Sequence, residues 1–185
     1  ELYAQGLKHE LGQGGLPKSM IKALRFYRVA AELQHPGALY KLGKTYCDRK
    51  ICEQDLNKAK GYFQKAASLG HVEAMYLLGS IYCNRYAKDF AQGIQLIENS
   101  VDEQPSLAKL YPTVYPKLFD AFFYGRLMPQ DLDKAEYYAK KTHELGNHSA
   151  ERCFLGIACH YHLVVGHNIE KAKRVYAFLV KQFNN

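Results

Sequence analysis

The sequence contains no tryptophan and few prolines, and its apolar residues never form a long uninterrupted run. Six prolines in 185 residues suit a helical chain, because proline removes a backbone donor and breaks helices. The most apolar segment, Cys153 to Cys159, is far shorter than the roughly 18 residues that a membrane-spanning helix needs. Hydrophobic residues still make up 48% of the chain, which argues against disorder and predicts a globular protein of about one domain.

The sequence also lacks a pattern of paired cysteines and a block of like charge. Its five cysteines are an odd number without a recurring spacing, which favours reduced thiols and a reducing compartment over a disulfide framework. The net charge of +7 comes from basic residues scattered between Lys8 and Lys181, so it permits an acidic partner without indicating one. The chain opens at Glu1 inside a patterned segment, which favours a trimmed chain, so a missing signal sequence excludes nothing about export.

What the sequence does contain is one unit repeated five times. The unit is marked by a capping residue, two further residues, a lysine and an alanine, as in Asp55-Leu-Asn-Lys58-Ala59. The equivalent small residues advance in steps of 36, 34, 42 and 37 positions and are Ala23, Ala59, Gly93, Ala135 and Ala172. A repeat of this period predicts an array of similar helical units.

A helix is predicted to follow the first residue of this mark in each unit. That residue has a side chain that accepts a hydrogen bond from a free amide at a helix start, and it is Ser19, Asp55, Asp89, Asp131 or Asn168. Apolar residues then recur at helical spacing, as at Ala59, Phe63 and Ala66. Gly70 and Gly146 follow two of these helices, at the position where a chain often leaves a helix with a positive φ.

Another helix is predicted upstream of this one. It is the first helix of each unit, and it carries a recurring Leu-Gly pair. The pair is Leu42-Gly43 in one unit and Leu78-Gly79 in the next. Glycine inside a helix costs about 1 kcal/mol relative to alanine. Its recurrence at one position therefore predicts a helix crossing too close for a side chain. The fourth unit departs from this pattern, because Leu118-Phe119 occupies the position there.

Together, these residues resemble the Sel1-like repeat, a relative of the tetratricopeptide repeat. Residues 38 to 71 carry the pattern A-x3-L-G-x2-Y followed by D-x2-K-A-x2-Y-F-x-K-A-A-x2-G-H. The resemblance implies an all-α, right-handed α-α superhelical solenoid of about five helix-turn-helix repeats, forming a single domain over residues 1–185. The units are expected at about residues 1–36, 37–72, 73–105, 106–147 and 148–185.

The segment from Pro105 to Pro116 departs from the repeat. It accounts for the step of 42 positions, and Pro112 and Pro116 do not both fit inside one straight helix. We expect a kinked or lengthened first helix in the fourth unit, with a local change in the superhelix.

The resemblance also implies a binding groove, because the first helices line the concave surface of tetratricopeptide-type solenoids. Counting from the Leu-Gly pair gives ten polar or aromatic residues that would face this groove: Tyr40, Lys44, Asp48, Tyr76, Ser80, Asn84, Asp120, Tyr124, His160 and Tyr161. Tyr40 and Tyr76 recur at one position and would form a ladder for a partner, or else pad adjacent helices. The expected function is a non-enzymatic scaffold or adaptor that binds a protein or peptide, with no cofactor, metal, small-molecule substrate or membrane insertion.

Three alternatives rest on weaker patterns. The tetrads Ser19-Met-Ile-Lys22 and Ser106-Leu-Ala-Lys109 have the S-x-x-K form of penicillin-recognising hydrolases, but the companion motifs are missing. Potential zinc ligands gather near the last helices without the usual paired spacing, at Cys153, Cys159, His160, His162 and His167. A basic solenoid that binds nucleic acid or another polyanion is the third alternative, and the scatter of the lysines disfavours it.

Overall fold

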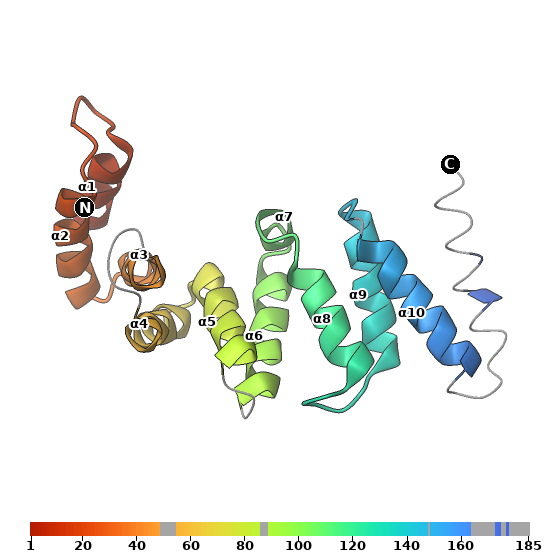
Figure 1. Cartoon of the computed structure of the whole chain (residues 1–185). Coiled ribbons are helices and arrows are strands. Elements are labelled where there is room, and N and C mark those ends of the chain that lie inside the picture. Colours follow the sequence, from red (N-terminus) through yellow and green to blue (C-terminus); the bar gives the residue numbers. More distant parts are fainter. Residues whose placement is uncertain (49–54, 86–88, 148, 164–172, 175–176, 178–185) are drawn as a thin grey trace. The chain divides into compact units, whose positions relative to one another are not determined.

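The computed structural model is helical and has no strand in the part of the chain that it describes, which confirms the expected all-α repeat fold. It describes residues 1–48, 55–85, 89–147, 149–163, 173–174 and 177 (Figure 1). Two compact units are present, residues 1–103 and residues 104–185, and we describe each by itself.

Unit 1 consists of three helix pairs in sequence order. Its helices are α1 (Leu2–Leu11), α2 (Met20–Glu32), α3 (Pro36–Cys47), α4 (Leu56–Ser68), α5 (Val72–Arg85) and α6 (Phe90–Glu103) (Figure 1). Within the pairs, α1 packs on α2, α3 on α4 and α5 on α6, while α2 also packs on α3 and α4 on α5. We call α1, α3 and α5 the first helices and α2, α4 and α6 the second helices.

The predicted capping residues begin the second helices. The side chain of Ser19 accepts a hydrogen bond from the backbone N–H of the residue three positions on, at 3.4 Å. The side chain of Asp55 does the same at 3.0 Å, and that of Asp131 does so at 2.9 Å at the start of the equivalent helix of the fourth repeat, Leu132–Glu144. Each bond satisfies one of the amides that a helix start leaves without an internal partner. Asp89 directly precedes α6, and Asn168 lies outside the described residues.

The recurring glycines of the first helices lie at close helix crossings, as predicted. A Cβ atom at Gly43 would lie 2.6 Å from Cε1 of Phe63, whose ring is fully buried. A Cβ atom at Gly79 would lie 2.6 Å from the backbone carbonyl oxygen of Gly93 in α6. The backbones of α5 and α6 therefore approach each other directly, with a glycine on each side.

A polar cluster ties together the first three helices of unit 1. The Glu10 carboxylate of α1 accepts hydrogen bonds from the Tyr27 hydroxyl of α2 and from Lys41 Nζ of α3, the latter at 2.8 Å to both oxygens. Burial raises the pKa of Glu10, but the bonds from Lys41 and Tyr27 outweigh that effect, and the net pKa is lowered. The carboxylate is therefore ionised at neutral pH and pairs with Lys41 across the first repeat junction.

Unit 2 has a broken first helix where the sequence predicted a kinked or lengthened one. Its helices are α7 (Leu107–Leu110), α8 (Val114–Tyr124), α9 (Leu132–Glu144) and α10 (Ser149–Leu163). Pro112 lies in the break between α7 and α8. Pro116 lies in the first turn of α8, where a missing N–H costs no internal hydrogen bond. Helix α8 packs on α9, and α10 packs on both of them. The segment predicted to pair with α10 lies largely outside the described residues.

Candidate functional site

The two tyrosines predicted to form a ladder in the groove are buried in unit 1. Tyr40 is 7% exposed and Tyr76 is 5% exposed. The Tyr40 ring stacks on the imidazole of His71, with ring centroids 4.5 Å apart, and tilts against Phe63 at 6.3 Å. These rings pack between helices, so the accessible surface of the first helices is made by other side chains.

The stack of Tyr40 on His71 is one of two equivalent contacts between successive helix pairs. In the preceding pair Tyr3 stacks on His35, with centroids 4.4 Å apart. Each histidine also caps the first helix that follows it, because its Nδ1 accepts a hydrogen bond from the backbone N–H three residues on, at 3.3 Å. Asn147 holds the equivalent position before α10, where its Oδ1 accepts from the Ser149 N–H at 2.9 Å. One residue thus both caps a helix and, where it is histidine, contacts the preceding pair.

This double role predicts a loss of stability in mild acid. Burial lowers the pKa of His71, so the folded protein holds this imidazole in the neutral form more strongly than the unfolded chain does. The unfolded chain therefore binds more protons below about pH 6.5, the ordinary histidine pKa. The contribution of neutral His71 to stability is therefore fully present above that pH. It is lost as the pH falls toward the lower pKa that His71 has in the folded state.

The measurement is urea unfolding between pH 7 and 5, beside His71→Asn, which keeps a capping side chain without the titration. We expect the loss on acidification to be smaller in the variant than in the parent chain. Equal losses in the two proteins would contradict the assignment to His71. Carboxylates such as Glu10 titrate at lower pH, so they contribute little to the difference in this window.

Lys44 and Asp48, two further predicted residues, are exposed at the end of α3. The Lys44 ammonium lies 5.5 Å from the ring centroid of Tyr40, within reach of a cation–π interaction. Asp48 follows the last turn of α3, and its backbone N–H donates to the Lys44 carbonyl oxygen at 3.1 Å. Lys44 thus places a positive charge beside the buried tyrosine, and Asp48 adds an opposite charge at the end of the helix.

Ser80 and Asn84, also predicted, line a pocket between α3, α4 and α5. We call it the first-helix pocket; it has a volume of about 230 Å³ and is lined by Cys47, Leu56, Phe63, Leu77, Ser80, Ile81 and Asn84. The lining is mainly apolar, with Ser80 and Asn84 as its polar members. Its residues come from the first helices α3 and α5 and from the second helix α4 between them, and most of them belong to the first helices.

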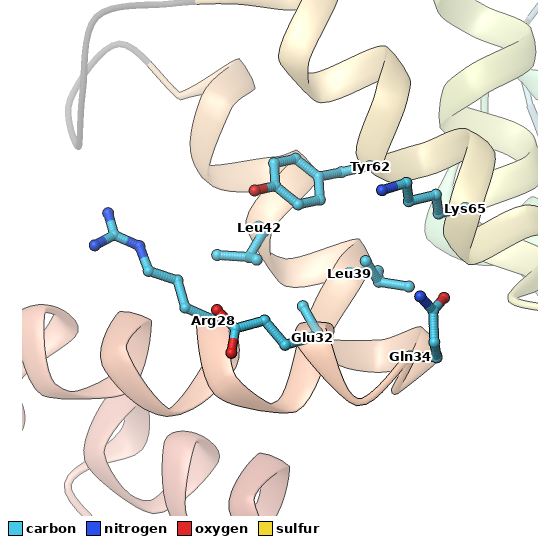
Figure 2. A pocket seen from close by; sticks show the side chains of 8 residues that line it. Arg28, Glu32, Gln34, Leu39, Leu42, Tyr62 and Lys65 are labelled. Carbon is cyan, nitrogen blue, oxygen red and sulfur yellow. The ribbon is translucent and has the colours of Figure 1, made fainter.

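A larger pocket, between α2, α3 and α4 of unit 1, was not found from the sequence. We call it the second-helix pocket; it has a volume of about 320 Å³ and is lined by Arg28, Ala31, Glu32, Gln34, Leu39, Leu42, Tyr62 and Lys65 (Figure 2). Its residues come from α2 and α4, from α3 between them, and from the turn that holds Gln34. Figure 2 shows Leu39 and Leu42 at its centre.

Gln34 is the residue of this pocket that a sequence comparison within the chain would have flagged. It has a left-handed backbone with φ 59°, and it is the one described residue other than glycine with a positive φ. The equivalent positions after α4 and α9 hold Gly70 and Gly146, with φ 79° and 66°. A residue with a Cβ atom pays about 1 kcal/mol for this conformation. The turn geometry is therefore shared by three units, but only this one carries a side chain there.

The remaining predicted residues belong to unit 2 and are Asp120, Tyr124, His160 and Tyr161. Asp120 of α8 forms an ion pair with Arg152 of α10, with 3.3 Å between Oδ1 and Nη1. Tyr124 is 49% exposed, and the Arg126 guanidinium lies 5.1 Å from its ring centroid. The side chain of Tyr161 lies outside those described. The exposed part of this set is a charged and aromatic surface on α8 and α10.

Three of the described cysteines form no disulfide bond. They are Cys47, Cys83 and Cys153. Burial raises the pKa of Cys47 and raises that of Cys153 to about 11. Both thiols are therefore protonated at neutral pH, which makes them poor nucleophiles and poor metal ligands.

The described residues gather no group of three or more potential ligands among histidine, cysteine, aspartate and glutamate. Of the proposed zinc ligands, His160 packs edge-on against Phe123, with centroids 5.6 Å apart. The side chains of Cys159 and His162, and all of His167, lie outside the described part of the chain.

The S-x-x-K tetrads have structural explanations. The Ser19 hydroxyl accepts from the backbone N–H of Lys22, so the first tetrad coincides with a helix cap. The Ser106 hydroxyl accepts from Gln104 Nε2 at 3.3 Å, in the exposed turn before α7.

Across the described ranges, every helix falls short of the length and apolar character needed to cross a membrane.

Comparisons with known proteins agree on the repeat. The family model described as Sel1 repeat matches residues 3–35, 36–71, 72–100 and 117–147. A Sel1 repeat protein from Oxalobacter formigenes has a similar structure, with 23% identity and a TM-score of 0.62, covering 95% of this chain and 68% of that one. So does c5321, a protective antigen present in uropathogenic Escherichia coli strains, which displays an SLR fold. For c5321 the identity is 20%, the TM-score 0.65 and the coverage 86% of this chain and 32% of that one, so the chain spans about a third of its length. No curated protein matches the sequence.

Proposed function

The chain belongs to the Sel1 repeat family, and from this premise we propose that it is a non-enzymatic scaffold that binds a partner protein or peptide along its first helices. Sel1 repeats generally serve as protein–protein interaction scaffolds. The fold alone does not select a partner, because helical repeats present surfaces of many kinds. The choice of partner therefore depends on the side chains that the first helices expose.

The first-helix pocket is the observation that carries the proposal. It combines apolar side chains from α4 and α5, such as Leu56, Leu77 and Ile81, with the polar Ser80 and Asn84. An apolar recess with a few polar groups suits an inserted side chain of a partner and orients the chain that carries it. Its volume of about 230 Å³ is on the scale of one or two apolar side chains rather than of a large cofactor.

The surroundings of this pocket support a peptide or protein as the occupant. Lys44 and Asp48 add exposed charges of both signs at the end of α3, next to Cys47 at the pocket wall. Mixed polar rims around an apolar centre are typical of protein interfaces. Tyr40 packs beside this surface, because its buried ring tilts against Phe63 of the pocket wall, and Tyr76 is buried on α5.

In unit 2 the proposed surface consists of the predicted residues on α8 and α10. Tyr124 with its neighbouring arginine is the exposed aromatic group there, and tyrosine and arginine are both enriched at binding hot spots. Asp120, paired with Arg152, and His160 flank it, and Tyr161 belongs to the same proposed set.

The proposal is tested by a photo-crosslinking amino acid placed at Asn84, at the edge of the first-helix pocket. The matched control places the same group at Asn99, which is exposed on α6 and does not line the pocket. In an extract of the native source we expect a crosslinked partner from position 84 at several times the yield from position 99. The crosslinked partner should be degraded by protease and should survive treatment with nuclease.

Equal yields at the two positions would contradict the placement of the surface. A product destroyed by nuclease would instead favour the polyanion-binding alternative and contradict a protein partner.

A further inference from the structure

We infer that the second-helix pocket is a separate binding site that takes a large apolar side chain from an acidic peptide segment. The inference does not rest on the first-helix pocket, because the two pockets share no lining residue. The occupant follows from three observations: a fixed apolar centre, unpaired charges around it, and a glutamine in a position that elsewhere holds glycine.

The apolar centre of the pocket is built by the packing of unit 1. Leu39 and Leu42 of α3 are buried in the core, and only part of each side chain faces the pocket. The Tyr62 ring forms one wall and stacks on Tyr46, with centroids 5.6 Å apart and an interplanar angle of 7°. These side chains are held by their neighbours, so the recess is present before any ligand binds, and little ordering is needed on binding.

The charges at the rim favour a carboxylate-bearing partner. Arg28 and Glu32 come from α2, and Lys65 comes from α4 across the pocket (Figure 2). Within the described ranges none of the three forms an ion pair, whereas the described ion pairs elsewhere engage lysines such as Lys41. Two cations against one carboxylate leave a local excess of positive charge, which complements acidic residues that flank an inserted apolar side chain.

Gln34 adds an amide group that can form hydrogen bonds with a peptide backbone. Its side chain lies at the pocket, and a primary amide both donates and accepts hydrogen bonds. The same turn is formed by glycine after α4 and after α9, so the turn itself does not require glutamine. A strained backbone that places an extra polar side chain at a recess is the kind of local cost that marks binding sites.

The probe for this site is a blocked pentapeptide with leucine at its centre and two glutamates on each side. Titration into the ¹⁵N-labelled full chain is followed by NMR at the backbone amides of Ala31, Gln34 and Leu42. We expect these amides to shift with saturation. A peptide with lysines in place of the glutamates should bind about tenfold more weakly because of its charge. One with alanine in place of leucine should bind at least about tenfold more weakly because it leaves the recess empty.

Two variants separate recognition from a structural role. Gln34→Gly should slightly raise the midpoint of thermal unfolding, because it relieves the left-handed strain, and yet weaken binding of the acidic leucine peptide severalfold. Lys65→Glu should remove most of the preference for the acidic peptide over the basic one. The matched control is Lys22→Glu, which makes the same charge change at an exposed position of α2 outside the pocket and should leave the preference intact.

Several results would overturn the inference. They are the absence of shifts at the three amides, equal binding of the acidic and basic peptides, and unchanged binding by Gln34→Gly. Inorganic phosphate that shifts the same amides as strongly as the acidic leucine peptide would show a simple anion site and would also overturn it. None of these results depends on crosslinking at Asn84, so the two proposals fail separately.

Discussion

Replacing Gly79 by alanine is expected to lower the free energy of unfolding by about 2 kcal/mol, within the range of about 1–3 kcal/mol typical of overpacked cores. The new Cβ atom would lie 2.6 Å from the carbonyl oxygen of Gly93 and 2.8 Å from Cγ1 of Ile97. A carbonyl oxygen of a neighbouring helix cannot turn aside as a side chain can. The crossing of α5 and α6 must therefore widen, and the contacts beside it are weakened.

The matched control is the same substitution at Gly61, in the interior of α4. Apart from the backbone of α4 around Gly61, no heavy atom lies within 4 Å of a Cβ atom built there, so only helix propensity acts. Gly61→Ala should raise the free energy of unfolding by up to about 1 kcal/mol. Urea denaturation of both variants measures the two effects with opposite sign. Stabilisation by both would show that α5 and α6 have room between their backbones, contrary to the structure.

Replacing Tyr40 by alanine is expected to cost about 3 kcal/mol of stability, at the lower end of the range for removing a buried aromatic ring. The substitution removes the stack on His71 and the contact with Phe63, and it leaves a cavity between two helix pairs. Urea denaturation is again the measurement. Tyr137→Ala is the matched control, because that ring is 50% exposed, and its loss should cost no more than about 1 kcal/mol.

If Tyr40→Ala leaves unfolding unchanged but abolishes crosslinking from position 84, then this ring serves recognition and not packing. If the variant is strongly destabilised, crosslinking should be compared at a temperature where it stays folded. Crosslinking at parental yield there would show that Tyr40 acts only through the stability of unit 1.

The fold was largely predictable because its determinants are local and recur. A helix start is indicated by a capping residue, as at Ser19, Asp55 and Asp131. A close helix crossing is indicated by a recurring glycine. Both signals lie within a few residues of the feature that they predict. The break between α7 and α8 was predicted only as a kink. Proline shows that a straight helix is impossible but does not say whether the chain bends or stops.

The candidate site was less predictable because burial depends on neighbouring repeats. Within its own helix, Tyr40 occupies a position that looks free to face a partner. What covers it is His71, which belongs to the turn before α5 and contacts it only once the pairs have stacked. The same limit applies to the second-helix pocket, whose walls come from three helices. Only Gln34 carried a local signal, as a side chain in a glycine position.

The histidine caps give the array of unit 1 a direction. His71 holds the first turn of α5 through the Ala74 amide, and its ring rests on Tyr40 of the preceding pair. Opening of α3 and α4 would therefore strip support from the start of α5, whereas opening of α5 and α6 would merely uncover a tyrosine. Fraying should consequently spread more readily toward the C-terminal pairs than toward the N-terminal ones. In such an array, the first pair stabilises the pairs that follow it more than they stabilise the first pair.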